Sequence, residues 1–236
     1  MDSTDLLLRR ANEADADDVA SVYLASRKAA PMPPLQQTDE SVRYWVEHKL
    51  QGYDETWVAE VAGRIVGYAR LAGDWLDDLY VAPTQARQGI GSALLDVVKS
   101  VRPDGFSLWV FEMNAAARAF YAKHGLVELA HTDGAANEEG APDLRVAWPG
   151  TQPLVFLRRL VDELDTELGA VLERRAVLTA AIQAYKPVGG PAGRDLDRER
   201  EIAERMARFA PRLGAERLQR IIHAVITESL DASEDA

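Results

Sequence analysis

The sequence predicts two domains of different fold class: an α/β domain over residues 1–149, with a mixed sheet and helices, and an all-α domain of three helices over residues 150–236. Three observations predict this division. Strand-like and helix-like segments alternate as far as Trp148. The stretch WPGTQP, which ends at Pro153, then breaks the pattern with prolines and a glycine. Beyond it, apolar residues recur at helical spacing and no strand-like segment follows.

The α/β domain is expected to begin with a strand over 6–11, followed by a helix that extends to Ser26. The proline-rich stretch PMPPL is a loop before a second helix, from about Thr38 to Leu50. Residues 57–73 predict two strands joined at Ala62-Gly63, which is a hairpin signal. The remaining expected elements are strands over 76–83, 106–113, 126–131 and 144–148, and helices over 90–101 and 115–124.

The second domain is expected to hold one helix of over 30 residues, from Pro153 to Lys186. A loop with the sequence KPVGGPAG follows, and then a second helix from Asp195 to Ala210. After a break at Pro211 to Gly214, a third helix is expected from Ala215 to about Ser233.

Composition and charge restrict the class of protein. The chain has 236 residues, no cysteine and a formal net charge of −11. The lack of cysteine excludes disulfides and thiolate metal sites, and the negative charge argues against non-specific nucleic-acid binding. Apolar runs stay shorter than the roughly 20 residues that span a bilayer, so we expect a cytoplasmic protein without a membrane partner. The histidines lack metal-ligand spacing, and we expect structural or surface roles for all of them: His48, His124, His131 and His223.

A glycine-bearing turn lies between a predicted strand and a predicted helix in the stretch VAPTQARQGIGSALL. Gly89 and Gly91 let backbone N–H groups approach an anion, and the helix that begins near Ile90 adds the positive end of its dipole. This arrangement suits a pyrophosphate. The stretch NAAARAFYAKHGL follows later in the chain, with Asn114 and Tyr121.

These two motifs together resemble the GNAT acyltransferase superfamily over residues 5–149. Its members carry Q/R-x-x-G-x-G/A after the fourth strand, and an Asn followed by a Tyr in the next strand–helix unit. In this sequence the first position of the motif is Ala86, flanked by Gln85 and Arg87.

The resemblance implies that acetyl-CoA is a cosubstrate and lies in a splay between the strands at 76–82 and 106–113. Pantetheine would pair with the first of these strands near Leu79 and Val81. The pyrophosphate would meet the backbone of the glycine-bearing turn, which consists of Arg87, Gln88, Gly89, Ile90, Gly91 and Ser92.

Two residues of the second motif have implied roles in acetyl transfer. Asn114 would hold the cofactor, and Tyr121 would protonate the departing thiolate; a packing aromatic is the alternative for Tyr121. The acceptor amine, which the sequence does not identify, must lose a proton to a base or to ordered water. The candidate bases, each with a solvated strand-end carboxylate as the favoured alternative, are Asp77, Asp78, Glu60 and Glu112.

Charged residues interrupt the apolar faces of the predicted helices in the second domain. Arg175 lies at heptad distance from both Leu168 and Ile182, and Lys186 follows on the same face, so both are expected to face inward, unlike Arg174. A buried unpaired cation costs several kcal/mol, so such groups either pair with one another, as in a helical interaction module, or await an anionic ligand. Further polar residues on the expected inner faces are Asp195, Arg198 and Glu199, ahead of Ile202, Met206 and Phe209, and Ser229 after Ile222, Val225 and Ile226.

This pattern resembles the all-helical, AroQ-type chorismate mutases over residues 154–233. The family arrangement has an Arg early in a long helix, then L-D, Arg, Lys, R-D-x-x-R-E and a terminal I-x-x-S. It falls without a gap through Glu199 on the following residues: Arg158, Leu164, Asp165, Arg175, Lys186, Arg194, Asp195, Arg198, Glu199 and Ser229.

The resemblance implies conversion of chorismate to prephenate, a unimolecular rearrangement that needs no cofactor, nucleophile or metal. Arg158 and Arg175 would clamp carboxylates, and Lys186 would donate to the ether oxygen. Glu199 would take the ring hydroxyl, with Asp195 assisting through its backbone. Further contacts would come from Arg198, through its charge, and from Ser229, at a carboxylate.

One departure and several alternatives accompany this interpretation. The family often places Gln or Glu four residues after the terminal Ser, as a second donor to the ether oxygen, whereas this chain has Ser233, with Glu234 next. The alternatives are a mutase whose α/β domain senses acyl-CoA without catalysis, an isochorismate pyruvate lyase, a 4-amino-4-deoxychorismate mutase, and a helical interaction module.

The long helix also predicts a homodimer. Its continuous apolar stripe cannot be covered by two shorter helices of the same chain, so we expect a second copy to cover it. Arg158 and Arg175 are separated by roughly 25 Å at helical rise, which is too far for both to clamp one small substrate within a chain. We therefore expect Arg158 to serve the partner's active site.

Overall fold

The computed structural model describes residues 6–51, 55–185 and 195–234. Contacts divide the chain into two compact units, Met1–Arg158 and Arg159–Ala236. The first unit therefore reaches slightly beyond the boundary expected at residue 149. The reason is Phe156, whose ring is buried against the backbone around Gly105, so that it belongs to the core of the first unit.

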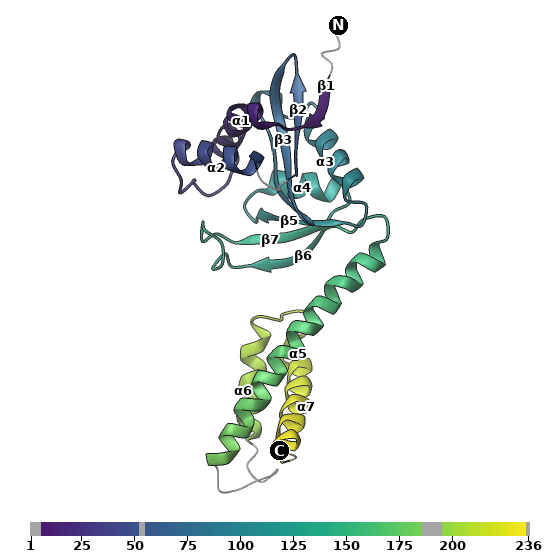
Figure 1. Cartoon of the computed structure of the whole chain (residues 1–236). Helices are drawn as coiled ribbons and strands as arrows, with labels where there is room; N and C mark the ends of the chain where they lie inside the picture. Colours follow the sequence, from purple (N-terminus) through teal and green to yellow (C-terminus); the bar gives the residue numbers. More distant parts are fainter. Residues whose placement is uncertain (1–5, 52–54, 186–194, 235–236) are drawn as a thin grey trace. The chain divides into compact units, whose positions relative to one another are not determined.

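The first unit is built on a mixed seven-stranded sheet with the order β1-β2-β3-β4-β5-β7-β6 (Figure 1). Its pairs are antiparallel except for β4–β5, which is parallel. The predicted α/β fold class is confirmed. The strands are β1 Leu6–Arg10, β2 Glu55–Val61, β3 Arg64–Ala72, β4 Trp75–Val81, β5 Phe106–Phe111, β6 Val127–Thr132 and β7 Asp143–Trp148.

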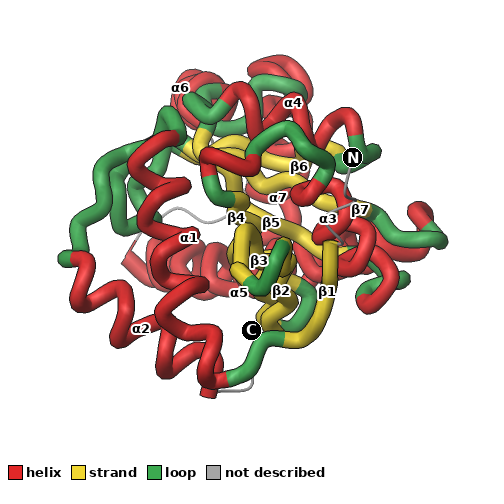
Figure 2. The backbone as a smooth tube through the Cα atoms, turned by 90° about the horizontal axis from the view of Figure 1, so that it is seen from above, coloured by secondary structure: helices red, strands yellow, loops and turns green. Residues whose placement is uncertain are grey.

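Helices cover both faces of the sheet. α1 (Ala16–Ala29) and α2 (Asp39–Gln51) lie on one side of β1–β4, and α3 (Ile90–Val101) lies on the other (Figure 2). The central strand β3 is accordingly buried along almost its whole length, as expected for a strand covered on both faces. α4 (Ala115–Lys123) packs through Tyr121 into the same core as α3.

The predicted hairpin between β2 and β3 turns at Ala62 and Gly63, which have φ angles of 51° and 74°. Positive φ at both central residues is the pattern of a type I′ turn, whose twist matches that of the strands. Gly67 on β3 is required for close packing and not for a turn. An added Cβ there would lie 3.0 Å from the carbonyl oxygen of Tyr80 and 3.2 Å from side-chain atoms of Ile90 and Leu94. Glycine at this position therefore lets the start of α3 approach the sheet closely.

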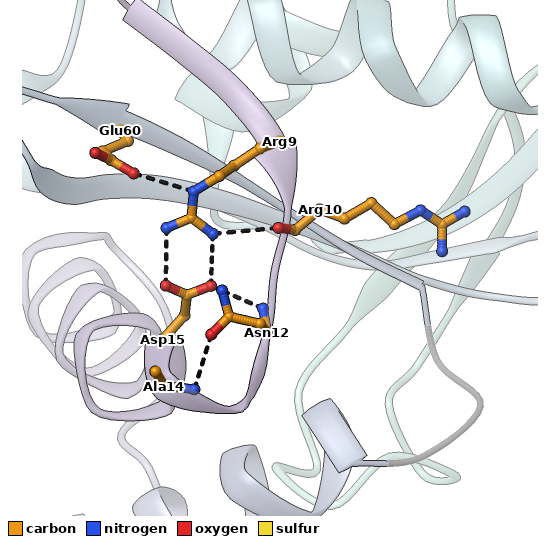
Figure 3. A network of polar contacts seen from close by, with 6 residues as sticks. All are labelled: Arg9, Arg10, Asn12, Ala14, Asp15 and Glu60. Atoms are coloured by element: carbon orange, nitrogen blue, oxygen red, sulfur yellow. Dashed lines mark hydrogen bonds and ion pairs between the residues drawn. The ribbon is translucent and has the colours of Figure 1, made fainter.

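A polar network fixes the start of α1 against β1 (Figure 3). Arg9 donates two hydrogen bonds to Asp15, at 2.7 and 2.9 Å, and a third to Glu60 at 3.0 Å. Asn12 accepts from the Ala14 N–H and donates its own backbone N–H to Asp15, which completes the capping box of the short 3-10 helix Glu13–Asp15 that precedes α1. The Arg9 guanidinium lowers the pKa of Asp15 below its ordinary value. α1 begins directly after this turn, at Ala16, so the chain enters the helix from a segment that is hydrogen-bonded to Arg9 of β1.

The second unit is helical, as predicted. Its helices are α5 (Pro153–Tyr185), whose first turns belong to the first unit, α6 (Leu196–Ala207) and α7 (Gly214–Glu234) (Figure 1). α6 ends before the expected Ala210, and Phe209, which was expected on the buried face, is 86% exposed. The buried apolar residues that hold α6 and α7 together are Ala203, Leu218 and Ile222.

The apolar stripe of α5 is exposed within a single chain. Leu164, Leu168 and Ile182 expose 62%, 53% and 54% of their surface. Together with Val161, Val171, Leu172 and Leu178 they form an extended apolar face, which we call the α5 stripe. The described part of the chain contains no helix that combines the length and the apolar character needed to cross a membrane.

Candidate active sites

Strands β4 and β5 open a cavity in the first unit. The two strands pair only at Trp75 and Ser107, near their amino ends, among the described residues. Beyond this pair the described residues of the two strands are not hydrogen-bonded to each other. The cavity between them has a volume of about 250 Å³. Its lining includes Leu76, Asp77, Leu79 and Tyr80 of β4, Trp109, Val110 and Phe111 of β5, Asn114, Ala117 and Tyr121 around α4, and Tyr23 and Arg27 of α1.

The glycine-bearing turn lies between β4 and α3, as predicted. Arg87 and Gly89 have positive φ angles of 66° and 87°, and both are exposed. The first hydrogen bond of α3 runs from the Ala93 N–H to the Gly89 carbonyl oxygen, so the N–H groups of residues 90–92 precede the helical ladder. Such groups at a helix N-terminus attract anions. The predicted residues Gln88 and Ile90 lie in the same turn, with Gln88 exposed and Ile90 buried in the core.

Gly91 leaves limited room at this turn. An added Cβ would lie 3.7 Å from side-chain atoms of both Val81 and Phe120, which is ordinary contact. A methyl group therefore fits, but a larger side chain meets those neighbours. The Ser92 hydroxyl pairs with His124 Nε2 at 3.0 Å.

The two β4 residues expected to meet pantetheine differ in their surroundings. Leu79 lines the cavity. Val81 is not part of the lining, and its carbonyl oxygen accepts a hydrogen bond from the Ser26 hydroxyl of α1 at 2.8 Å. Of the two, Leu79 is the residue that the structure places at the opening.

Asn114 and Tyr121 both line the cavity, one from the N-terminus of α4 and the other from its last turns. Asn114 is the N-cap of α4 and accepts from the Ala117 N–H at 3.1 Å. Tyr121 is buried, with 8% of its surface exposed. Burial, with a smaller contribution from the charge of Asp78, raises the pKa of Tyr121 above its ordinary value. The phenol is thus protonated at neutral pH, as a general acid must be.

The four candidate bases differ in their ion pairs, their burial and their distance from the cavity. Glu60 pairs with Arg9, and Glu112 is exposed outside the cavity lining. Asp78 is buried and accepts from Arg70 Nε at 2.6 Å. Asp77 remains at the cavity wall and also contacts Arg70, at 2.9 Å.

Sequence reasoning missed three charged residues at this cavity: Arg27, Glu139 and Asp143. The Arg27 side chain is 4% exposed and donates to Glu139 at 2.8 Å. Asp143 accepts from the Thr132 hydroxyl and from the Asn137 amide. None of these contacts follows a local spacing pattern, so no motif could have indicated them.

In the second unit, Arg175 and Ser229 come together as predicted for one inner face. The Arg175 guanidinium donates to the Ser229 hydroxyl at 2.8 Å, and Ser229 is buried. Arg174 is exposed and contacts its own helix, through Ala170. The Ser233 hydroxyl donates to the Leu230 carbonyl oxygen within α7 at 2.6 Å.

α6 presents fewer inward charges than expected. Glu199 is buried at 4% exposure, whereas Arg198 and Asp195 are exposed, so the expectation that all three head a buried stripe is wrong for the single chain. Adjacent helical residues point about 100° apart, so Glu199 and Arg198 cannot both face α7. Asp195 instead is the N-cap of α6 and accepts from the N–H groups of Asp197 and Arg198.

His223, expected to have a structural or surface role, lies at the predicted site. Its Nδ1 is 3.2 Å from a carboxylate oxygen of Glu199. Arg158 is exposed on α5. Lys186 and Arg194 lie outside the described residues. Among the described residues, no cluster of three or more possible metal ligands is present.

The fold and site of the first unit define the class of the protein. A mixed sheet with a parallel β4–β5 opening, a glycine-bearing turn at the start of α3 and a buried tyrosine at the cavity are together typical of an N-acetyltransferase fold. Structures with this fold include YjaB from Escherichia coli, with a TM-score of 0.52 and 22% identity, covering 62% of this chain and 99% of that one. YncA from Salmonella typhimurium, solved with its cofactor acetyl-CoA, has a TM-score of 0.52 and 18% identity, covering 63% and 95%.

The chain belongs to the GNAT family of acetyltransferases. The model of the acetyltransferase (GNAT) domain matches residues 52–128, and that of chorismate mutase type II matches residues 157–234, which confirms both predicted resemblances. The peptidyl-lysine N-acetyltransferase YiaC of Escherichia coli (strain K12) is 33% identical over 103 residues, covering 42% of this chain and 67% of YiaC. The protein named "Probable N-acetyltransferase Rv2775" of Mycobacterium tuberculosis is 30% identical over 151 residues, covering 57% and 84%.

Proposed function

We propose that the chain is a bifunctional enzyme. Its helical domain rearranges chorismate to prephenate, and its α/β domain transfers an acetyl group from acetyl-CoA to an amine. The observation that carries the proposal is that each unit gathers the chemistry its reaction needs. Tyr121 and Asn114 meet at the β4–β5 cavity, and Arg175, Ser229 and Glu199 line the inner faces of the helical unit.

The residues around the glycine-bearing turn fit acetyl-CoA. The exposed turn would offer backbone N–H groups to a pyrophosphate, and Arg87 and Gly89 have the left-handed backbone conformation that is common in anion-binding turns. Leu79 and Asn114 would hold the pantetheine arm in the cavity. The bound thioester supplies the acetyl group.

The transfer step assigns one role to Tyr121. The amine nitrogen forms a bond to the acetyl carbon as the carbon–sulfur bond breaks, and the Tyr121 hydroxyl protonates the sulfur. An ammonium acceptor loses two protons in becoming the amide, of which one ends on the thiol and one passes to solvent. Asp77, at the cavity wall, is a candidate to accept the first of these protons, directly or through water.

The mutase step rests on positioning and electrostatics. Arg175, held by Ser229, would bind a substrate carboxylate bidentately, and Glu199 would accept from the ring hydroxyl. Lys186 would donate to the ether oxygen. His223 contacts Glu199 and would orient its carboxylate. Further contacts would come from Arg198, Asp195 and, from a second copy, Arg158.

The α5 stripe supports a homodimer. Its exposed apolar residues would be covered by the same helix of a second chain, which would also bring Arg158 of that chain to the site. We propose that the domains separate near residue 150 in sequence, with the first turn of α5 packed onto the first domain.

The test is to incubate the protein with chorismate and follow its loss and the formation of prephenate, with and without acetyl-CoA. Prephenate formation is the expected result. Release of pyruvate, or turnover of isochorismate or 4-amino-4-deoxychorismate in place of chorismate, would contradict the proposed reaction. Binding of acetyl-CoA without transfer to any amine would reduce the α/β domain to a sensor.

A further inference from the structure

A second cavity adjoins the one between β4 and β5. It has a volume of about 260 Å³ and lies between α1, α2 and the segment before β7. Tyr23 and Glu139 line both cavities, so the two cavities are neighbours with these side chains between them. An elongated ligand whose reacting end lies in the first cavity would reach the second cavity by passing these two side chains.

The walls of both cavities carry an excess of negative charge. The carboxylates are those of Asp77, Glu139 and Asp143 in the first cavity, and of Glu138 and Glu139 in the second. Among the described residues that line the cavities, Arg27 is the one cation. Its buried guanidinium is held by Glu139 at 2.8 Å, and Arg70, which lies outside the lining, pairs with Asp77 at 2.9 Å and with Asp78 at 2.6 Å. The carboxylates of Asp143 and Glu138 then remain in excess, since the hydroxyl and amide groups that donate to them are neutral. The surroundings therefore favour a cationic ligand over an anionic one.

The second cavity combines this charge with apolar and aromatic surface. Glu138 is exposed and accepts a hydrogen bond from the neutral Gln37 amide at 2.9 Å, which leaves its negative charge in place. The rings of Tyr23 and Trp45 lie 6.1 Å apart and, with Val42, provide surface for methylene groups. Aromatic rings also attract cations, and the Trp45 ring already has the Arg70 guanidinium 4.9 Å from its centroid.

We propose that the acyl acceptor is a small aliphatic amine that carries a second ammonium group and no carboxylate, such as a linear diamine or polyamine. The proposal rests on the acetyl transfer proposed above. The reacting amine lies in the first cavity, where Tyr121 protonates the departing sulfur. The second ammonium lies in the second cavity against Glu138. A free amino acid is disfavoured because its carboxylate would face the acidic walls.

The test measures binding of four amines to the full chain in the presence of coenzyme A, by calorimetry at low salt. Putrescine and spermidine should bind about tenfold more tightly than n-butylamine, which lacks the second charge, and more tightly than lysine, which adds a carboxylate. Release of coenzyme A from acetyl-CoA should follow the same order.

Two variants locate the second charge. Glu138→Gln should weaken putrescine binding roughly threefold, the size expected for an exposed ion pair. Glu47→Gln removes the same charge from an exposed position on α2 that lines neither cavity and should change binding less than the Glu138 variant does.

Equal affinity for putrescine and n-butylamine, or equal effects of the two variants, would overturn the proposal. Preferential transfer to a lysine-containing peptide would overturn it as well, in favour of a macromolecular acceptor. Diamine-selective binding without release of coenzyme A would show that the proposed transferase function, rather than the acidic pocket, is wrong.

Discussion

The two units bring their candidate site residues together in different ways. In the α/β unit, β4, β5, α1 and α4 of a single chain enclose a cavity that contains the buried Tyr121. In the helical unit, Arg175, Ser229 and Glu199 face inward, but Arg198 and the α5 stripe are exposed. Arg158, the last residue of the first unit, is exposed as well. The first candidate site is lined by elements of one chain, whereas some of the residues proposed for the second site face solvent.

This difference shows what each architecture can do alone. A twisted sheet that separates two parallel strands creates a cavity through its backbone, and side chains from neighbouring elements only need to line it. A helix presents its functional residues along a stripe, and the stripe becomes a pocket when another surface covers it. α5 is longer than either α6 or α7, so a second copy has surface left to cover.

The largest expected effect tests the inner face of the helical unit. Arg175→Ala should lower kcat/KM for chorismate by about a thousandfold, because it removes a charged donor that Ser229 holds in place. Arg174→Ala should change turnover by less than about twofold, since Arg174 is exposed and contacts its own helix. Steady-state kinetics on both variants decides the matter, and equal losses would contradict the assignment of faces.

The second prediction tests the enclosed site of the α/β unit. Tyr121→Phe should lower kcat for acetyl transfer by about a hundredfold and leave the affinity for acetyl-CoA nearly unchanged. Because burial raises the pKa of Tyr121, the wild-type rate should not decline as pH rises from about 7 to about 9. A Phe variant with normal kcat would make Tyr121 a packing residue.

The third prediction concerns the glycine-bearing turn. Gly91→Trp should weaken acetyl-CoA binding by more than about thirtyfold in calorimetry, because its ring would meet Val81 and Phe120. Gly91→Ala is the matched control and should bind nearly normally, because a Cβ there has ordinary contacts. Chorismate turnover should stay near normal in both variants; its parallel loss in the Trp variant would indicate general unfolding.

The fourth prediction tests whether the helical site needs a second copy. Chains with Arg158→Ala and chains with Arg175→Ala should each be nearly inactive. When the two are co-refolded in equal amounts, half of the dimers are mixed and each regains one intact site, so activity should recover to about a quarter of wild type. If mixed dimers form and no activity returns, the site is built within one chain.

Local spacing in the sequence was enough to predict several elements and site residues. The hairpin at Ala62-Gly63, the turn at Gly89 and the inward position of Arg175 each depend on residues close together in the chain. Such features follow from backbone geometry and helical periodicity, which act over a few residues. The two-domain division was predictable because the strand-like pattern ends at WPGTQP.

Only the tertiary structure decided which distant side chains share a site. Arg27 and Glu139 form an ion pair although 112 residues separate them, and no local pattern relates their positions. On α6, the packing of α7 determined that Glu199 and not Arg198 is buried, and it placed His223 against that carboxylate. Periodicity restricts a residue to one side of its own helix or strand, but its neighbours are determined by how the chain returns to that side.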